Sequence, residues 1–290
     1  MKSARQSRAR AAIACLYTDL DGTLLGAGAS LFRTAEGGFT LLAARALELC
    51  YRADIEVVLM SGRKRVQVAE DARLIGQSAF IYELGGGLAV DGQDFLLVGE
   101  EWLPRSADET VFDRVAASGA PEILLDRFAG RLEPHAPWHR ERRITHLFRG
   151  LVEPSAAEAA LAEAGVDGLR LVDNGVLPPG ECRLSLEAPA HAYHLLPKPA
   201  SKATAVARHM AIRGLAREQC IAVGDSREDL AVAPLVGRFF LVRNALDEDP
   251  SLREELDRYG NVEVTAGAAG EGVYEAVVRS LSERAAPRVA

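Results

Sequence analysis

Short apolar runs alternate with segments of helical period in the first third of the chain. Continuous, partly β-branched apolar residues predict strands over residues 13–18 and 55–60. Apolar positions at helical spacing predict helices over residues 39–53 and 64–76, and a further strand is predicted within residues 78–86. The order strand, helix, strand, helix, strand is typical of a parallel sheet with helices on both faces.

This regular alternation is lost in the middle third of the chain. Helices are predicted there over residues 108–119 and 155–165, each followed by a strand-like run, but Pro and His interrupt the pattern. Further along, the alternation of the first part returns. The pattern therefore predicts one α/β domain, residues 1–105 and 197–290, interrupted by an inserted α+β cap, residues 106–196.

Composition restricts the partners more than it restricts the fold. Apolar residues make up 48% and charged residues 26% of the 290 residues, which is usual for a globular protein. The formal net charge of −7 argues against a nucleic acid or an anionic membrane as partner, because both require a basic footprint. A small anionic substrate stays compatible with this charge, provided that positive charge is gathered locally, and we expect a monomer or a homodimer.

Targeting signals are weak. Basic residues precede an apolar run that ends at Tyr17, as in signal peptides, but no small-residue cleavage site follows. No segment approaches the ~18 apolar residues of a membrane span. The four cysteines show no CxxC spacing, which favours reduced, buried thiols. We therefore expect a cytoplasmic protein.

Polar residues suited to one reaction stand where several predicted strands end. Two carboxylates, Asp19 and Asp21, follow the first apolar run, and two more, Asp225 and Asp229, follow a later one. Active sites of open parallel sheets lie at the carboxyl ends of the strands, so these groups are expected to meet. The full set comprises Asp19, Asp21, Gly22 and Thr23 after the first strand, Ser61, Gly62 and Arg63 after the second, Lys202 at a helix start, and Gly224, Asp225, Ser226 and Asp229 after the later strand.

The order of these groups resembles the four motifs of the haloacid dehalogenase-like (HAD) superfamily of phosphohydrolases. Those motifs are DxDGT, a Ser or Thr after the second strand, a Lys, and GDxxxD, and the matching residues extend from Asp19 to Asp229. The resemblance implies a doubly wound parallel, Rossmann-like α/β core with an α+β cap inserted after the third core strand. Cof-like, sucrose-phosphate and mannosyl-3-phosphoglycerate phosphatases share that arrangement.

The resemblance also implies a separate task for each aspartate. Asp19 is expected to be the nucleophile that forms an aspartyl-phosphate. Asp19, Asp225 and the backbone carbonyl of Asp21 offer hard oxygen ligands, which suit Mg²⁺, and the cation would hold the like charges together. The side chain of Asp21 is expected to act first as general acid and then as general base.

The remaining motif residues are expected to hold the phosphate. Ser61 and Lys202 would donate hydrogen bonds to its non-bridging oxygens, where transition-state charge gathers. Gly22 and Thr23 permit a tight turn, and Asp229 is expected to orient Lys202 or a metal-bound water. Further supporting positions are Gly62, Arg63 and Ser226.

Three of these assignments have purely structural alternatives. Ser61 would also be suited to cap the helix that follows it. Asp229 would also be favourable as a first-turn carboxylate near the positive end of a helix dipole. Lys198 competes with Lys202, but Lys198 lies between two prolines, as in a linker, whereas Ser201 is suited to be an N-cap with Lys202 in the first turn.

An arginine- and histidine-rich stretch, residues 134–150, lies in the predicted cap. If residues 142–149 form a strand, alternation places Arg143 and Arg149 on one face and His146 on the other. We predict these three residues as substrate contacts, with the arginines serving a second anionic group. A solvated, charged strand face is the alternative.

The chain departs from the family pattern at two positions. Glu83 is followed by Leu84, where many relatives have an Asn-Gly pair, and Ala203 stands where relatives often carry Gly after the lysine. The first departure leaves the substrate side near Glu83 open.

The predicted function is Mg²⁺-dependent phosphomonoester hydrolysis of a small metabolite, either a sugar phosphate or a glycosyl-phosphoglycerate. A phosphotransferase or phosphomutase of the same superfamily is one alternative. Mutases, however, usually carry a helical cap between the first two motifs, where residues 24–60 hold little beyond one helix. A non-enzymatic sugar-phosphate sensor is the other alternative, although a sensor would not need Asp21.

Overall fold

The computed structural model describes residues 12–177, 180 and 182–285, and their contacts divide the chain into two compact units. One unit is formed by Met1–Val58 together with Met210–Ala290, and the other by Leu59–His209. The basic N-terminal residues 1–11, considered above as part of a signal peptide, lie outside the described residues. In the described part of the chain, no helix combines the length and the apolar content needed to cross a bilayer.

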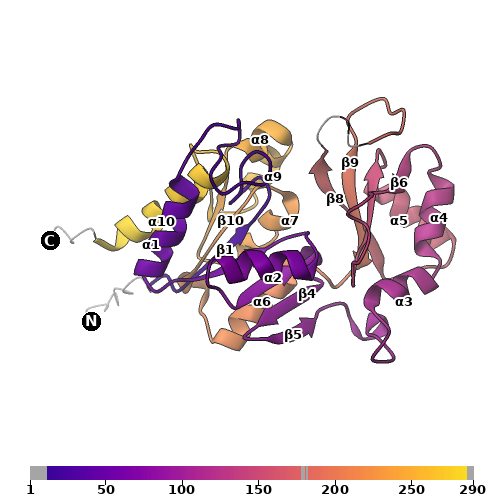
Figure 1. Ribbon diagram of the computed structural model, residues 1–290, viewed down its shortest axis with the longest axis horizontal. Helices are drawn as coiled ribbons and strands as arrows, with labels where there is room; N and C mark the ends of the chain where they lie inside the picture. Colours follow the sequence, from indigo (N-terminus) through magenta and orange to yellow (C-terminus); the bar gives the residue numbers. More distant parts are fainter. Residues whose placement is uncertain (1–11, 178–179, 181, 286–290) are drawn as a thin grey trace, which may run out of the picture. The chain divides into compact units, whose positions relative to one another are not determined.

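The first unit is built on parallel strands in the order β12-β11-β10-β1. Its strand β1 is buried along its whole length, as expected for a strand covered on both faces. Helices α1 and α10 lie side by side (Figure 1). The elements are β1 (Cys15–Asp19), α1 (Leu42–Arg52), η3 (Arg217–Gln219), β10 (Cys220–Gly224), α7 (Arg227–Leu230), η4 (Ala233–Leu235), β11 (Arg238–Leu241), α8 (Asn244–Glu248), α9 (Leu252–Leu256), β12 (Val262–Val264) and α10 (Ala269–Ala285).

Strand β2 (Glu56–Met60) contributes to both units. In the first unit the amide of Glu56 donates to the carbonyl of Ala14, 2.9 Å away. In the second unit Leu59 and Met60 pair in parallel with Phe80 and Ile81 of β3. The order there is β2-β3-β4-β5, and β4 and β5 are antiparallel additions. The elements are α2 (Arg65–Leu74), β3 (Ala79–Tyr82), η1 (Glu83–Gly85), β4 (Gly87–Val90), β5 (Gln93–Leu96) and η2 (Glu100–Trp102).

The second unit also contains a four-stranded antiparallel sheet in the order β6-β7-β9-β8. Helices α3, α4 and α5 lie to one side of this sheet (Figure 1). The elements are α3 (Val111–Ala117), α4 (Ala120–Arg127), β6 (Leu132–Pro134), β7 (His146–Gly150), α5 (Pro154–Glu163), β8 (Leu169–Val176), β9 (His191–Pro197) and α6 (Lys202–Arg213), of which α6 extends into the first unit.

The α/β class predicted from the sequence is confirmed, with parallel strands and a separate α+β sheet. One local prediction is wrong. Strand β7 begins at His146, so residues 142–145 do not continue it and their side chains do not alternate between two faces. The physical reason is that three successive amides of this segment converge on one buried carboxylate. The boundaries predicted at residues 105 and 196 stay a prediction.

Candidate active site

Three carboxylates converge in the first unit. Oxygen atoms of Asp19, Asp225 and Asp229 lie within 4.8 Å of one another. Asp19 ends β1 and Asp225 follows β10, and these parallel strands are in register with Thr18 opposite Val223. Because Asp19 is also buried, the repulsion between such close charges calls for a cation. Carboxylate oxygens at this spacing fit a hard divalent ion such as Mg²⁺.

Asp229 supports Asp225 through the backbone. Its Oδ2 accepts hydrogen bonds from the Ser226 hydroxyl at 2.6 Å, the Ser226 amide at 3.1 Å and the Asp225 amide at 3.3 Å. Ser226 in turn caps α7 by accepting from the Asp229 amide. Asp229 therefore occupies the helix-start position that was the structural alternative, and this capping box fixes the loop that carries Asp225. Its expected role toward Lys202 or a metal-bound water stays a prediction.

A tight turn after β1 carries Asp21, Gly22 and Thr23. Gly22 has a φ of +79°, and a Cβ added there would lie 2.2 Å from Oδ2 of Asp225. The turn therefore passes so close to the carboxylate cluster that only glycine fits. Asp21 is exposed, and its side chain does not belong to the cluster of three carboxylates.

Asn244 holds this turn and was not predicted from the sequence. Its Nδ2 donates to the carbonyl of Gly22 at 2.9 Å, and its Oδ1 accepts from the amide of Ala269 at 2.9 Å. Asn244 is buried, so both contacts are protected from water. The available signal was its position shortly after strand β11, at the same edge of the sheet as Asp19 and Asp225.

Ser61, Gly62 and Arg63 form a turn after β2 in the second unit. Ser61 is buried, and its hydroxyl accepts from the amide of Arg63 at 3.1 Å. The alternative that Ser61 caps the following helix is wrong, because α2 begins at Arg65 with Lys64 as its N-cap. The Arg63 guanidinium pairs with Asp71 at 2.9 Å.

Lys202 is the first residue of α6, and only 2% of it is exposed. The Ser201 hydroxyl accepts from the amide of Thr204 at 3.0 Å, which confirms Ser201 as the predicted cap. Lys198 is exposed, as a linker residue would be. A lysine is rarely buried without a polar partner, so the two lysines differ clearly in their surroundings. The choice of Lys202 as the functional lysine stays a prediction.

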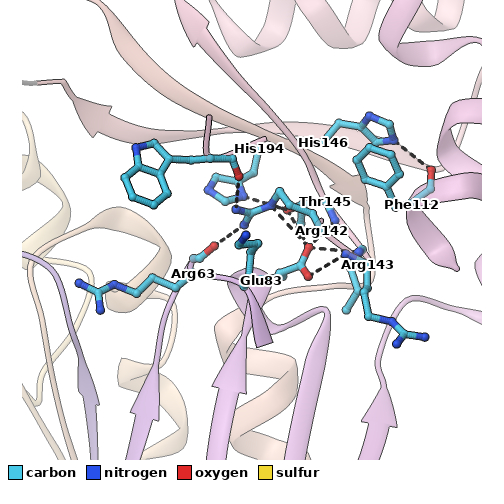
Figure 2. A network of polar contacts seen from close by, with 12 residues as sticks. Arg63, Glu83, Phe112, Arg142, Arg143, Thr145, His146 and His194 are labelled. Atoms are coloured by element: carbon cyan, nitrogen blue, oxygen red, sulfur yellow. Dashed lines mark hydrogen bonds and ion pairs between the residues drawn. The ribbon is translucent and has the colours of Figure 1, made fainter. Parts of the chain in front are cut away.

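The three residues predicted as substrate contacts have different surroundings. The His146 ring stacks on Phe112 with centroids 3.6 Å apart, and burial lowers the pKa of His146. Arg149 pairs with Glu133, with 2.6 Å between Nε and Oε1. Arg143 is exposed, and Figure 2 shows its guanidinium directed away from the surrounding polar network. Their role toward substrate stays a prediction.

Comparison with known proteins finds relatives among the phosphatases. No family model matches the chain. A phosphoglycolate phosphatase of Methanoculleus marisnigri is 25% identical, with 90% of this chain and 94% of the relative covered. One of Halorubrum lacusprofundi is 27% identical over 83% of this chain and 88% of the relative. The chain is thus similar, over most of its length, to proteins named phosphoglycolate phosphatases. Both relatives carry the name of a phosphoric monoester hydrolase, which is the enzyme class that the motifs predict.

Solved structures share the HAD fold along nearly the whole chain. A HAD phosphatase of Bacteroides thetaiotaomicron matches with a TM-score of 0.63 at 15% identity, covering 96% of this chain and 99% of that one. A sucrose-phosphatase of Synechocystis, solved with sucrose and phosphate, matches with a TM-score of 0.59 at 16% identity, covering 93% and 98%. The predicted HAD core with an added α+β sheet is thereby confirmed as the fold.

Proposed function

We propose that this protein is a HAD-like phosphatase that hydrolyses phosphomonoesters with Mg²⁺ through an aspartyl-phosphate on Asp19. The observation that carries the proposal is the cluster of Asp19, Asp225 and Asp229, whose oxygens lie within 4.8 Å. A carboxylate that attacks a phosphate dianion faces strong repulsion. A bound Mg²⁺ would supply the positive charge that lowers this repulsion.

The chain's own residues would carry out two successive displacements. In the first, an oxygen of Asp19 forms a bond to phosphorus, the ester P–O bond breaks, and Asp21 gives its proton to the leaving alkoxide. In the second, water attacks the same phosphorus, Asp21 takes its proton, and the Asp19–phosphate bond breaks to release inorganic phosphate. The exposure of Asp21 supports this assignment, because an acid–base group must reach leaving group and water.

Ser61 and Lys202 are proposed as donors to the non-bridging phosphate oxygens, supported by the order of the motifs and by their burial. Asn244 is added to the set as the residue that fixes the Gly22 turn. Asp229 is proposed to keep Asp225 in place through the capping box.

The substrate is proposed to be a small phosphorylated metabolite. The motif group favours a sugar phosphate or a glycosyl-phosphoglycerate, whereas the curated relatives are phosphoglycolate phosphatases. Phosphoglycolate and phosphoglycerates share a carboxylate close to the phosphate. An exposed arginine such as Arg143 is suited to such a second anion.

The test is release of inorganic phosphate from a panel containing phosphoglycolate, hexose phosphates, sucrose phosphate and glycosyl-3-phosphoglycerates, with Mg²⁺ and with EDTA. The Asp19→Asn variant serves as the blank. Release that requires both Mg²⁺ and Asp19 is the expected result. Transfer of the phosphoryl group to an added sugar without release would favour the phosphotransferase, and binding without any turnover would favour the sensor.

A further inference from the structure

A buried carboxylate lies at the end of β3 in the second unit. Glu83 is 0% exposed, and its oxygens accept from the amides of Arg143 at 3.1 Å, Ile144 at 3.1 Å and Thr145 at 2.7 Å. The Thr145 hydroxyl donates a fourth hydrogen bond at 3.1 Å. Burying a carboxylate is costly unless its lone pairs are satisfied. All four of these hydrogen bonds to Glu83 come from residues 143–145, directly before β7.

The backbone around Glu83 holds the Ser61 turn. The Glu83 amide donates to the carbonyl of Arg63 at 3.0 Å, and the Leu84 amide donates to the carbonyl of Ser61 at 3.1 Å. Both Glu83 and Leu84 have positive φ, 46° and 55°, which costs about 1 kcal/mol or more for a residue with a side chain. Such strain persists where surrounding contacts impose it.

Arg142 connects the Ser61 turn with Glu83 and Thr145. Its Nη2 donates to the carbonyl of Gly62, its Nε donates to the Thr145 hydroxyl at 2.8 Å, and Nε lies 3.6 Å from Oε2 of Glu83. Its side chain is 3% exposed. The successive carbonyls of Ser61, Gly62 and Arg63 are thus all held, two by the Glu83 turn and one by Arg142. Figure 2 shows Arg142 and Thr145 beside the carboxylate of Glu83.

His194 packs against Thr145 and Gly62 of the same network. Its Nδ1 lies 3.2 Å from the Thr145 hydroxyl, and a Cβ added at Gly62 would meet its Nε2 at 3.2 Å. Burial lowers the pKa of His194 well below its ordinary value, and the charge of Arg142 acts in the same direction. His194 is therefore neutral near pH 7 and adds no second positive charge beside Arg142.

The other end of the Glu83 turn touches the lysine. Gly85 has a φ of +83°, and a Cβ added there would lie 2.1 Å from the Ser201 carbonyl and 2.6 Å from the Lys202 amide. One three-residue turn, η1, therefore contacts the backbone beside both residues assigned above as phosphate donors.

We propose that Glu83 and Arg142 are positioning residues for the phosphate site. They fix the Ser61 turn by joining it to residues 142–145, and this inference rests on the proposed function. Packing alone would not require this chemistry, because apolar residues of similar volume often stabilise a core as well as a buried ion pair does. The directional guanidinium fork sets the orientation of the Gly62 carbonyl. That carbonyl shares a peptide unit with the Arg63 amide, which donates to the Ser61 hydroxyl at 3.1 Å, so a rotation of this peptide would remove the hydrogen bond that orients Ser61.

The experiment is a double-mutant cycle between Arg142 and Ser61. Lysine keeps the charge at position 142 but lacks the fork that reaches Thr145 and Gly62 together. In the Ser61 enzyme, Arg142→Lys should lower kcat/KM about 10- to 100-fold, since a small misplacement of a donor costs that much. In the Ser61→Ala enzyme, the same substitution should change kcat/KM less than about twofold, because the donor it positions is already gone.

Two controls separate positioning from general stability. Arg114 also donates to a backbone carbonyl, that of Glu101, and its side chain is 11% exposed. Arg114→Lys should change thermal stability to a similar degree and leave kcat/KM unchanged. Should Arg142→Lys fail to fold, Thr145→Val removes the hydroxyl that Arg142 contacts, and Thr145→Ser restores it. The valine variant should lose activity and the serine variant should recover it.

Equal loss from Arg142→Lys in both Ser61 backgrounds would overturn the proposal, as would full activity of the single variant. Equal activity of Thr145→Val and Thr145→Ser would overturn it as well. Absence of phosphate release by the unsubstituted enzyme would be a different result, because it would contradict the proposed function itself.

Discussion

Replacing Gly22 by alanine would place a methyl group against a proposed metal ligand. The new Cβ would lie 2.2 Å from Oδ2 of Asp225, whereas ordinary contacts begin at 3.4 Å. The carboxylate end must therefore move by about 1 Å, since the backbone of the turn is also held by Asn244. Mg²⁺ tolerates deviations of only about 0.2 Å from its ligand distances.

Stability and metal binding should respond very differently to this change. The positive φ of Gly22 makes alanine unfavourable by about 1–2 kcal/mol, which lowers Tm by only a few degrees. Displacing a ligand should weaken Mg²⁺ binding by at least about tenfold, because even indirect disturbance of a ligand has effects of that size. Calorimetric titration with Mg²⁺ and thermal unfolding measure the two quantities separately.

Gly214 provides a matched control for the cost of placing alanine at a positive φ. It has a φ of +65°, and an added Cβ would meet nothing within 4 Å. Gly214→Ala should therefore show a similar loss of Tm and an unchanged Mg²⁺ affinity. If Gly22→Ala also kept the Mg²⁺ affinity of the parent, the assignment of Asp225 as a ligand would be refuted.

Three further substitutions test other parts of the molecule. Asp19→Asn should lower phosphate release at least about a thousandfold. In EDTA it should raise Tm, because it removes one of three neighbouring negative charges and so lowers their repulsion. A lower Tm would contradict this argument. In Gly85→Ala the new methyl group would overlap the Ser201 carbonyl, which should lower the free energy of unfolding by more than about 2 kcal/mol. The control is Gly92→Ala, where φ is +81° and the added Cβ meets nothing within 4 Å, so the loss should be only about 1 kcal/mol. Unfolding in urea measures both values. The pKa of His194 is lowered in the folded protein. Below the ordinary pKa of about 6.5, the unfolded chain therefore binds a proton at this residue that the folded protein does not bind, and the free energy of unfolding falls as the pH drops. From pH 7 to 5.5 this one residue should account for about 1 kcal/mol, which His194→Asn should abolish; an unchanged pH dependence would show that His194 is not the group responsible.

The carboxylate cluster could be predicted because its members directly follow apolar strands. Asp19 and Asp225 each come at the end of a parallel strand, and topology alone brings such ends to one edge. Ser61 was predicted in the same way, and Lys202 was predicted from its place at the start of a helix. For all of these residues the information is local in the sequence, since each stands at one end of a strand or helix.

The contacts around Glu83 could not be predicted from the periodicity of the sequence. Residues 142–145 have the composition of a strand, but their amides turn toward one carboxylate 60 residues earlier in the chain. A contact of this kind depends on a partner that no local pattern reveals. The departure from the family pattern at Leu84 was the one local hint, and the structure shows Leu84 at a φ of +55°.

The parallel pairing of β1 with β10 has a consequence for synthesis on the ribosome. Cys15 pairs with Cys220, so the first strand waits for a neighbour that is made roughly 200 residues later. At about 5–20 residues per second this delay is on the order of ten to forty seconds. Residues 59–209 emerge in one stretch and can begin to fold during that time. The edge of β1 that faces β10 therefore stays unpaired in a nascent chain for that time, although β1 is buried in the finished protein, and an unpaired strand edge of this kind favours aggregation until its partner arrives.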